Sequence, residues 1–168
     1  MNVQQKEKGF TIIEVVLVLA IAGLIFMMVF IALPALQRSQ RDTQRKNDLS
    51  RAVTALTNYT STNRGSLPTA GVWNTTFKTQ YLTNSGDDSF VDPAGACSSP
   101  CTEPTATSYM FVLSTAALPS FGSDTTQNTI YYSAGYTCDT DGAVKTAGSR
   151  KVALRMALEG GGVACQNN

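Results

Sequence analysis

The 168-residue sequence contains no histidine. Because histidine is the commonest general base, proton shuttle and metal ligand near neutral pH, most of the usual catalytic and metal sites are excluded. The sequence also has no Gly-x-Ser-x-Gly nucleophile elbow and no phosphate-binding glycine loop. We therefore expect a protein that is not an enzyme and needs no cofactor. An anchored extracytoplasmic enzyme that uses serine and lysine is the alternative.

Charge is scarce overall and absent from one long stretch. The net charge is +1, which gives no argument for binding to nucleic acid or to a membrane surface. No lysine or arginine occurs between Phe10 and Gln37, and the apolar run Val15–Leu33 has 19 residues. A helix of that length is about 29 Å long, which matches the hydrocarbon core of a bilayer.

One carboxylate, Glu14, lies at the start of this apolar run. Carboxylates within a membrane are rare, and they are normally paired with a cation. The nearest cation that the chain can provide is the α-amine that cleavage between Gly9 and Phe10 would create. In a helix that amine lies four residues, or about 6 Å of rise, from Glu14. The pattern therefore indicates a chain that is cleaved first and assembled afterwards.

Together these features resemble the N-terminus of a type IV prepilin. The resemblance rests on a short basic leader, a glycine before an aromatic residue, a nearby glutamate and a long apolar run, namely Lys6, Lys8, Gly9, Phe10, Thr11, Glu14 and Val15–Leu33. It implies that a prepilin peptidase cuts after Gly9 and methylates the new Phe10 amine. It also implies that Glu14 pairs with the Phe10 amine of a neighbouring subunit. An uncleaved anchor and an ordinary signal peptide, whose apolar region is usually shorter, are the alternatives.

The distribution of basic residues points to the opposite orientation. More basic residues follow the apolar run than precede it, which by the positive-inside rule places the C-terminal part in the cytoplasm. These residues are Lys6 and Lys8 before the run, and Arg38, Arg41, Arg45, Lys46 and Arg51 after it. We nevertheless expect export, because the leader motif and the paired cysteines both require it.

The four cysteines lie in the C-terminal two-thirds of the chain. In an exported domain an even number predicts two disulfides, for which three connectivities are possible. Proximity in the sequence favours Cys97–Cys101 and Cys138–Cys165. A structural zinc site is the alternative, and it is disfavoured because there is no histidine and only one closely spaced cysteine pair.

We expect the apolar run to continue as a helix to about Tyr59. Gly23 and Pro34 weaken this helix, so we expect a break there, with an extended segment between them in an assembled filament. Further on, apolar residues recur at helical spacing and predict a face that packs on a sheet. They are Leu49, Ala52, Val53, Leu56 and Tyr59.

The basic segment Arg38–Arg51 is interrupted by Asp42 and Asp48. This mixture of signs predicts a solvated helix face whose cations pair with acids on neighbouring subunits. A contact with nucleic acid is the alternative.

The rest of the chain predicts a small sheet. Residues 69–107 are rich in turn-forming residues and predict a long connection with little regular structure. Arg155 is expected on the solvated face of the last long strand, and Asp141-Gly142 predicts a hairpin turn. The predicted strands are Tyr109–Ser114, Thr129–Thr137 and Lys151–Leu158, with short pieces at Ala143–Lys145 and Val163–Cys165.

Two acidic groups are candidates for calcium. They are Asp139 with Asp141, and Asp87 with Asp88 and Asp92. Each has fewer acids than a defined calcium loop, so ordinary turns are favoured over a metal site.

These observations predict an α+β fold, type IV pilin-like, with a long N-terminal helix packed on a small antiparallel sheet. We expect a leader at 1–9, a stem at 10–60 whose residues 12–33 span the membrane, and a globular head with two disulfides at 61–168. The alternative contact with DNA, in a minor pilin, would use the local basic cluster Lys145, Arg150, Lys151 and Arg155.

The resemblance implies a structural subunit of a type IV pilus, used in adhesion, twitching motility or DNA uptake. Its partners would be identical or related pilin subunits, the prepilin peptidase and the pilus assembly platform. It would lie in the cell membrane as a single-pass protein before assembly and in an extracellular filament afterwards. A pseudopilin of a type II-like secretion system and a DNA-binding minor pilin are the alternatives.

Overall fold

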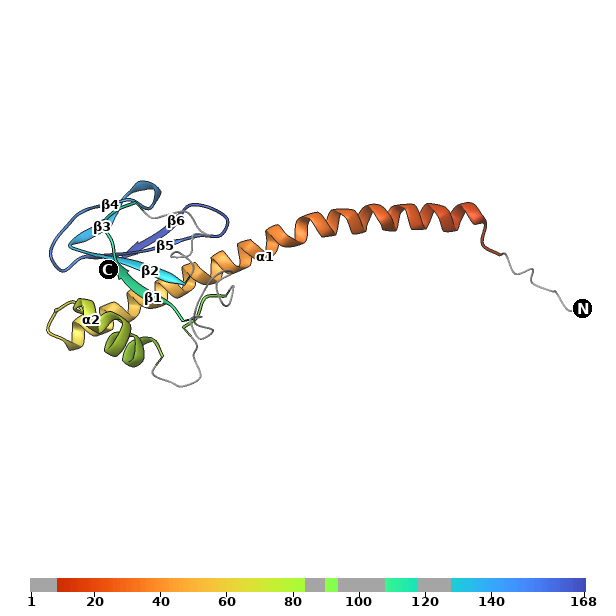
Figure 1. Ribbon diagram of the computed structural model, residues 1–168. Helices are drawn as coiled ribbons and strands as arrows, with labels where there is room; N and C mark the ends of the chain where they lie inside the picture. Colours follow the sequence, from red (N-terminus) through yellow and green to blue (C-terminus); the bar gives the residue numbers. More distant parts are fainter. Residues whose placement is uncertain (1–8, 84–89, 94–107, 118–127) are drawn as a thin grey trace, which may run out of the picture. The chain divides into compact units, whose positions relative to one another are not determined.

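The computed structural model describes residues 9–83, 90–93, 108–117 and 128–168. The chain divides into two units, Met1–Gln37 and Arg38–Asn168. The elements, shown in Figure 1, are α1 (Ile12–Thr62), α2 (Ala70–Val72), η1 (Trp73–Leu82), β1 (Met110–Leu113), β2 (Thr129–Ala134), β3 (Tyr136–Cys138), η2 (Thr140–Gly142), β4 (Val144–Thr146), β5 (Val152–Ala157) and β6 (Val163–Asn167).

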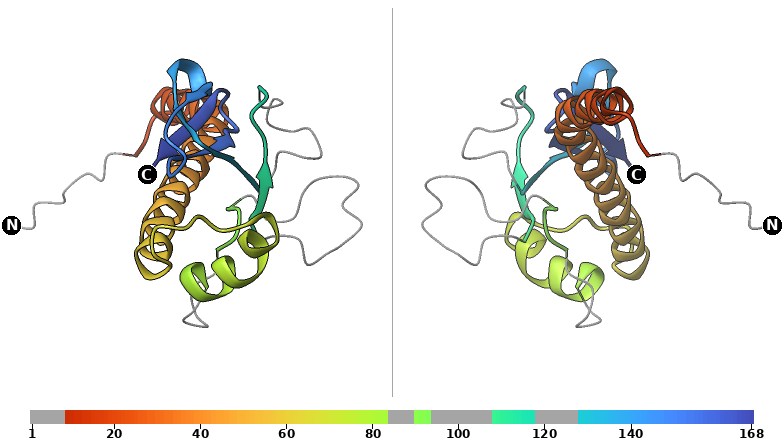
Figure 2. Two further views of the ribbon diagram at one scale, coloured as in Figure 1. Left: turned by 90° about the vertical axis from the view of Figure 1, so that its left-hand side faces the viewer. Right: turned by 90° about the vertical axis from the view of Figure 1, so that its right-hand side faces the viewer.

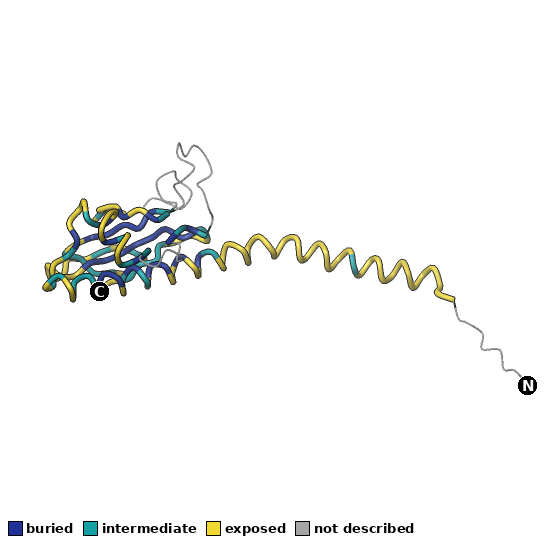
Figure 3. Tube along the Cα trace, turned by 90° about the horizontal axis from the view of Figure 1, so that it is seen from below, coloured by how far each residue is buried: buried dark blue, intermediate teal, exposed yellow. Residues whose placement is uncertain are grey.

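The first unit is built on the N-terminal part of α1. Its apolar side chains are exposed, as the yellow part of the helix in Figure 3 shows. Among the described residues, α1 alone is long and apolar enough to cross a membrane by length and composition, with a mean hydropathy of 3.1 in its most apolar window.

Helix α1 continues through Gly23 and Pro34 without interruption. A proline removes one backbone hydrogen bond, whereas the alanine and leucine residues beside it favour the helix. The helix break that the sequence predicts at these two residues is therefore not present in the single chain. Extension of this segment on assembly remains a prediction.

The C-terminal part of α1 supplies one side of the core of the head. Leu49, Ala52 and Leu56 are fully buried, and Val53 and Tyr59 pack against the same cluster. The amphipathic face predicted from the sequence is confirmed. Apart from buried Ala55, the residues between these positions are polar, so this part of α1 buries one face only.

The head contains a four-stranded sheet in the order β1-β2-β5-β6 and a separate pair, β3-β4 (strands labelled in Figure 1, with two further views in Figure 2). Strands β1 and β2 are parallel, and the other neighbours are antiparallel. The α+β class is confirmed, but the sheet is mixed and not wholly antiparallel. The strand predicted over Thr129–Thr137 is in fact two strands in different sheets, because Gly135 has a φ of 81° and turns the chain between them.

The prediction of little regular structure is wrong for the start of segment 69–107. Residues 70–82 are helical, and η1 is a π-helix in which the N–H of Thr83 donates to the carbonyl of Lys78, five residues earlier (3.1 Å). Trp73 and Phe77 are buried, and the ring of Trp73 stacks on Tyr132 with centroids 4.4 Å apart. Buried aromatic side chains hold this helix to the sheet.

The prediction of a solvated face for β5 is also wrong. Every residue of β5 is buried, and Arg155 is 1% exposed. Its guanidinium donates to the carbonyls of Ser114 (2.7 Å) and Ala116 (3.0 Å). The chain beyond β1 and the β3–β4 hairpin cover the face that the sequence predicts to be open. Burial lowers the pKa of Arg155.

Candidate functional site

The predicted cleavage junction, Gly9–Phe10, precedes the first turn of α1. Neither residue is helical, and the side chain of Phe10 is 90% exposed. No atom lies within 4 Å of the position that a Cβ on Gly9 would take. The peptide bond between the two residues is therefore open to a protease.

Thr11 and Glu14 form a reciprocal cap at the start of α1. The backbone N–H of Thr11 donates to Glu14 Oε2 (2.9 Å), and the N–H of Glu14 donates to Thr11 Oγ1 (3.4 Å). Thr11 Oγ1 also donates to Glu14 Oε2 (2.8 Å). This is a capping box, in which a threonine and a glutamate three residues later satisfy the free N–H groups of a helix end. The role of Thr11 is not in the sequence interpretation above, although its Thr-x-x-Glu spacing carries the signal.

In the Glu14 carboxylate, one oxygen accepts hydrogen bonds and the other is available to a further donor. Oε2 takes both bonds from Thr11, and Oε1 accepts no hydrogen bond from any residue that the structure describes. Beside it, a surface groove of about 310 Å³ is lined by Phe10, Val15, Val18 and Leu19 together with Glu14. The carboxylate can therefore take a cationic donor on Oε1 while its cap remains in place.

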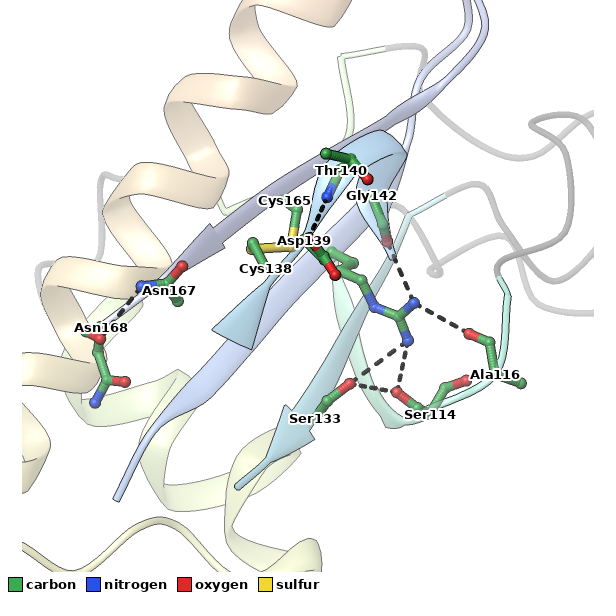
Figure 4. The surroundings of a disulfide bond; sticks show 11 residues. Ser114, Ala116, Ser133, Cys138, Asp139, Thr140, Gly142, Cys165, Asn167 and Asn168 are labelled. Atoms are coloured by element: carbon green, nitrogen blue, oxygen red, sulfur yellow. Dashed lines mark hydrogen bonds between the residues drawn. A yellow bond between two sulfur atoms is a disulfide. The ribbon is translucent and has the colours of Figure 1, made fainter. Parts of the chain in front are cut away.

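The disulfide Cys138–Cys165 joins β3 to β6, with the two Cα atoms 5.9 Å apart (Figure 4). It is one of the two pairs that sequence proximity favours. Next to it, Asp141 and Gly142 form the predicted turn between β3 and β4, with φ values of 56° and 75°. The other predicted pair, Cys97–Cys101, lies outside the described residues.

The basic segment of α1 is only in part the solvated face that the sequence predicts, because Arg38 and Lys46 are exposed whereas other cations are not. Arg45 is fully buried, and its guanidinium donates to both carboxylate oxygens of Asp92 (2.7 and 2.8 Å) and to Asp42 (3.0 Å). Arg41 Nε donates to Glu159 Oε2 (2.7 Å), and Arg41 Nη2 pairs with the other oxygen of that carboxylate. These cations pair with acids of their own chain.

Asp42 connects this ion-pair network to the turn between β5 and β6. Its two oxygens accept the backbone N–H groups of Glu159 (2.8 Å) and Gly160 (2.7 Å). Burial opposes the charged form of Arg45, but Asp92, Asp42 and Glu159 together outweigh burial, so the pKa of Arg45 lies above its ordinary value. The network fixes α1 to the turn and to the segment 90–93.

A second buried polar contact lies one turn further along α1. Tyr109 Oη donates to Asp48 Oδ2 (3.2 Å), and Arg51 pairs with Asp48 at 3.3 Å. Burial raises the pKa of Tyr109 and also that of Asp48. Tyr109 and Asp48 are buried inside the head. The guanidinium of Arg51 also lies over the ring of Phe90, 5.6 Å from the ring centroid.

The calcium and DNA alternatives gain no support from the described residues. Asp92 is held by Arg45, Asp139 accepts the N–H of Thr140 (2.9 Å), and no group of three potential metal ligands occurs in the described part of the chain. Asp87 and Asp88 lie outside it. In the basic cluster proposed for DNA, Arg155 is buried and Lys145 lies 3.9 Å from Asp139.

Comparison with known families matches residues 4–30 to the prokaryotic N-terminal methylation motif. This is the type IV prepilin-like signature, and it covers the exposed junction and the capped glutamate described above. The long helix followed by a small mixed sheet matches the α+β architecture of type IV pilins. No curated protein and no solved structure gives a match.

The motif supports a type IV pilin- or pseudopilin-like precursor. Motif and fold together suggest a structural subunit and not an enzyme. The motif also implies processing by a prepilin peptidase and assembly into pilus polymers, and the apolar helix is consistent with membrane anchoring before assembly.

Proposed function

We propose that this chain is a structural subunit of a type IV pilus, a surface filament of the kind used in adhesion, twitching motility or DNA uptake. The observation that carries the proposal is the methylation motif at residues 4–30, within which an exposed Gly9–Phe10 bond precedes the capped Glu14. A secretion pseudopilin and a DNA-binding minor pilin are the alternatives from the same scaffold, and nothing in the described part of the chain favours either over a pilus subunit.

The first step in this proposal is proteolysis. A prepilin peptidase cuts after Gly9, and the new α-amine of Phe10 is methylated. Cleavage leaves Thr11 in place, so the capping box that starts α1 survives in the mature chain. The mature N-terminus is then a cation on an apolar residue at the end of a membrane-length helix.

The second step is assembly. The Phe10 amine of a neighbouring subunit binds Glu14 Oε1, the oxygen that Thr11 leaves open. An ion pair in an apolar setting is strongly preferred over an unpaired carboxylate, so a subunit in the correct register is favoured over one that is displaced. The exposed apolar side chains of α1 then pack against those of other subunits, with no covalent chemistry.

The test separates the charge of Glu14 from its role as a helix cap. In Glu14→Gln the amide oxygen still accepts from Thr11, because glutamine also fits a capping box, but the charge is lost. In Thr11→Ala the charge is kept and the side-chain cap is lost. We expect both variants to be inserted and cleaved, Glu14→Gln to give a strongly reduced filament yield, and Thr11→Ala to give filaments near the wild-type amount.

The readout is the amount of sheared surface filament relative to processed subunit in the membrane. Wild-type amounts of filament from Glu14→Gln would contradict the proposed role of the charge. A loss in Thr11→Ala as large as that in Glu14→Gln would show that the charge alone does not decide assembly and that the helix cap is also needed.

A further inference from the structure

The outer edge of β1 is the feature that the proposed function leaves unexplained. Strand β1 is the end strand of the four-stranded sheet, and its apolar residues Met110, Val112 and Leu113 are 50%, 38% and 60% exposed. An edge strand with exposed apolar residues is a template for pairing with another chain. A protein that polymerises brings many such edges close together.

The hydrogen bonds of β1 show which backbone groups face outward. The N–H groups of Met110 and Ser114 donate to the carbonyls of Asn128 (2.9 Å) and Tyr132 (3.1 Å), on the side of β2. In a strand, alternate residues direct their backbone groups to opposite sides. The N–H and C=O of Phe111 therefore point away from β2, where a further strand would bind.

The side chain of Asn74 occupies that position. The N–H of Phe111 donates to Asn74 Oδ1 (2.7 Å), and Asn74 Nδ2 donates to the carbonyl of Phe111 (2.8 Å). The carboxamide thus offers the donor and acceptor that a neighbouring strand would offer. Two residues earlier, the outward N–H of Tyr109 donates to the carbonyl of Phe90 (3.3 Å).

The fold holds Asn74 in this position through its neighbours. Trp73 and Phe77 of η1 are buried, and both rings contact Phe111, with centroids 5.2 and 5.6 Å away. These contacts place η1 alongside β1 and turn Asn74 to the strand edge. An asparagine reaches both groups of one residue because its amide is both donor and acceptor.

We propose that Asn74 closes the outer edge of β1 and prevents the heads from pairing strand to strand with a second copy of this chain. Association is then left to other surfaces of the molecule. The inference rests on the hydrogen bonds of the sheet edge and holds whether or not the chain forms pili.

The test compares Asn74→Ala with Gln80→Ala in the full chain, in density-matched detergent micelles. Gln80 is a matched control because it is an exposed amide on the same element. We expect the backbone amide of Phe111 to exchange with solvent roughly tenfold faster in Asn74→Ala, since one hydrogen bond is lost. We also expect concentration-dependent association above the wild-type level by sedimentation, and wild-type behaviour from Gln80→Ala.

Two further variants test whether any added association occurs through the edge of β1. Adding Leu113→Lys to Asn74→Ala places a charge on the edge and should return association to the wild-type level. Asn74→Ser replaces the alanine variant where that does not fold, because serine has one side-chain polar atom in place of the two with which Asn74 binds Phe111. The proposal is overturned where the folded variant associates no more than the wild type, or where Leu113→Lys leaves the added association unchanged.

Discussion

Single residues explain why a charged helix segment can lie inside the head. Arginine side chains are usually exposed, yet that of Arg45 is fully buried. It is tolerated because Asp92 binds it through two hydrogen bonds and Asp42 through a third. Removing Arg45 from such a buried network takes away the cation that offsets the burial of the carboxylates, which costs more than the network contributes.

We predict that Arg45→Met destabilises the head by about 3–5 kcal/mol. The physical reason is that the buried carboxylate of Asp92 loses the two hydrogen bonds that the Arg45 guanidinium donates to it. The measurement is the free energy of unfolding in urea. Lys46→Ala is the control, because Lys46 is the next residue and is exposed, and a change within about 0.5 kcal/mol is expected there.

Gly142 gives a second prediction at this scale. A Cβ there would lie 2.4 Å from Val163 Cβ, and its φ of 75° disfavours any other residue. We expect Gly142→Ala to cost about 1–3 kcal/mol through overpacking against β6. Gly148→Ala is the matched control, because no atom lies within 4 Å of its Cβ position. Equal stability of the two variants in thermal unfolding would show that the turn does not need a glycine.

At the scale of elements, the turn between β5 and β6 depends on charge. The carboxylate of Glu159 accepts hydrogen bonds from Arg41 and Arg45, and these bonds hold its pKa below the ordinary value of 4.5. A carboxyl whose pKa is lower in the folded state binds fewer protons there than in the unfolded state. Its contribution is therefore present above pH 4.5 and is lost as the pH falls through the folded-state pKa.

We predict that the stability difference between wild type and Glu159→Gln shrinks as the pH falls below 4.5. The measurement is urea unfolding of both proteins from pH 7 down to pH 3. Asp48 titrates in the opposite sense, because burial raises its pKa, so it cannot produce this loss. A difference that stays constant over the range would show that the ion pairs of Glu159 do not support the turn.

The elements also show what the sequence could and could not predict. The stem, the strands and the turn at Asp141-Gly142 follow from local patterns, because apolar periodicity and turn residues act over a few positions. The π-helix η1 does not follow from composition, because polar residues rich in threonine separate its aromatics, although Trp73, Phe77 and Tyr81 recur every four residues. The burial of Arg155 was missed because the segment that covers β5 is distant in the sequence.

The sequence predicts the local part of the candidate site but not the contacts between distant residues. The motif from Gly9 to Glu14 is local, so its residues could be identified from the chain alone. The ion pairs of Arg41 and Arg45 join α1 to residues more than 40 positions away, and no sequence spacing indicates them. For that reason the sequence predicts pairing with neighbouring subunits, whereas Arg41 and Arg45 of this segment pair within their own head.

At the scale of the whole molecule, the two units have different roles in the proposed function. The first unit exposes nearly all of its apolar side chains and carries the processing motif. The second unit buries several charged residues, among them Arg45 and Arg155, and closes its sheet edge at Asn74. We infer that the stem supplies the contacts that hold subunits together, and that the head is built to stay a separate folded body.

The most direct measurement is mass spectrometry of the intact subunit from filaments sheared off native cells. The account predicts a chain that begins at Phe10, carries a methyl group on its α-amine and keeps Glu14 unmodified. Filaments that polymerise normally from subunits still beginning at Met1 would contradict it.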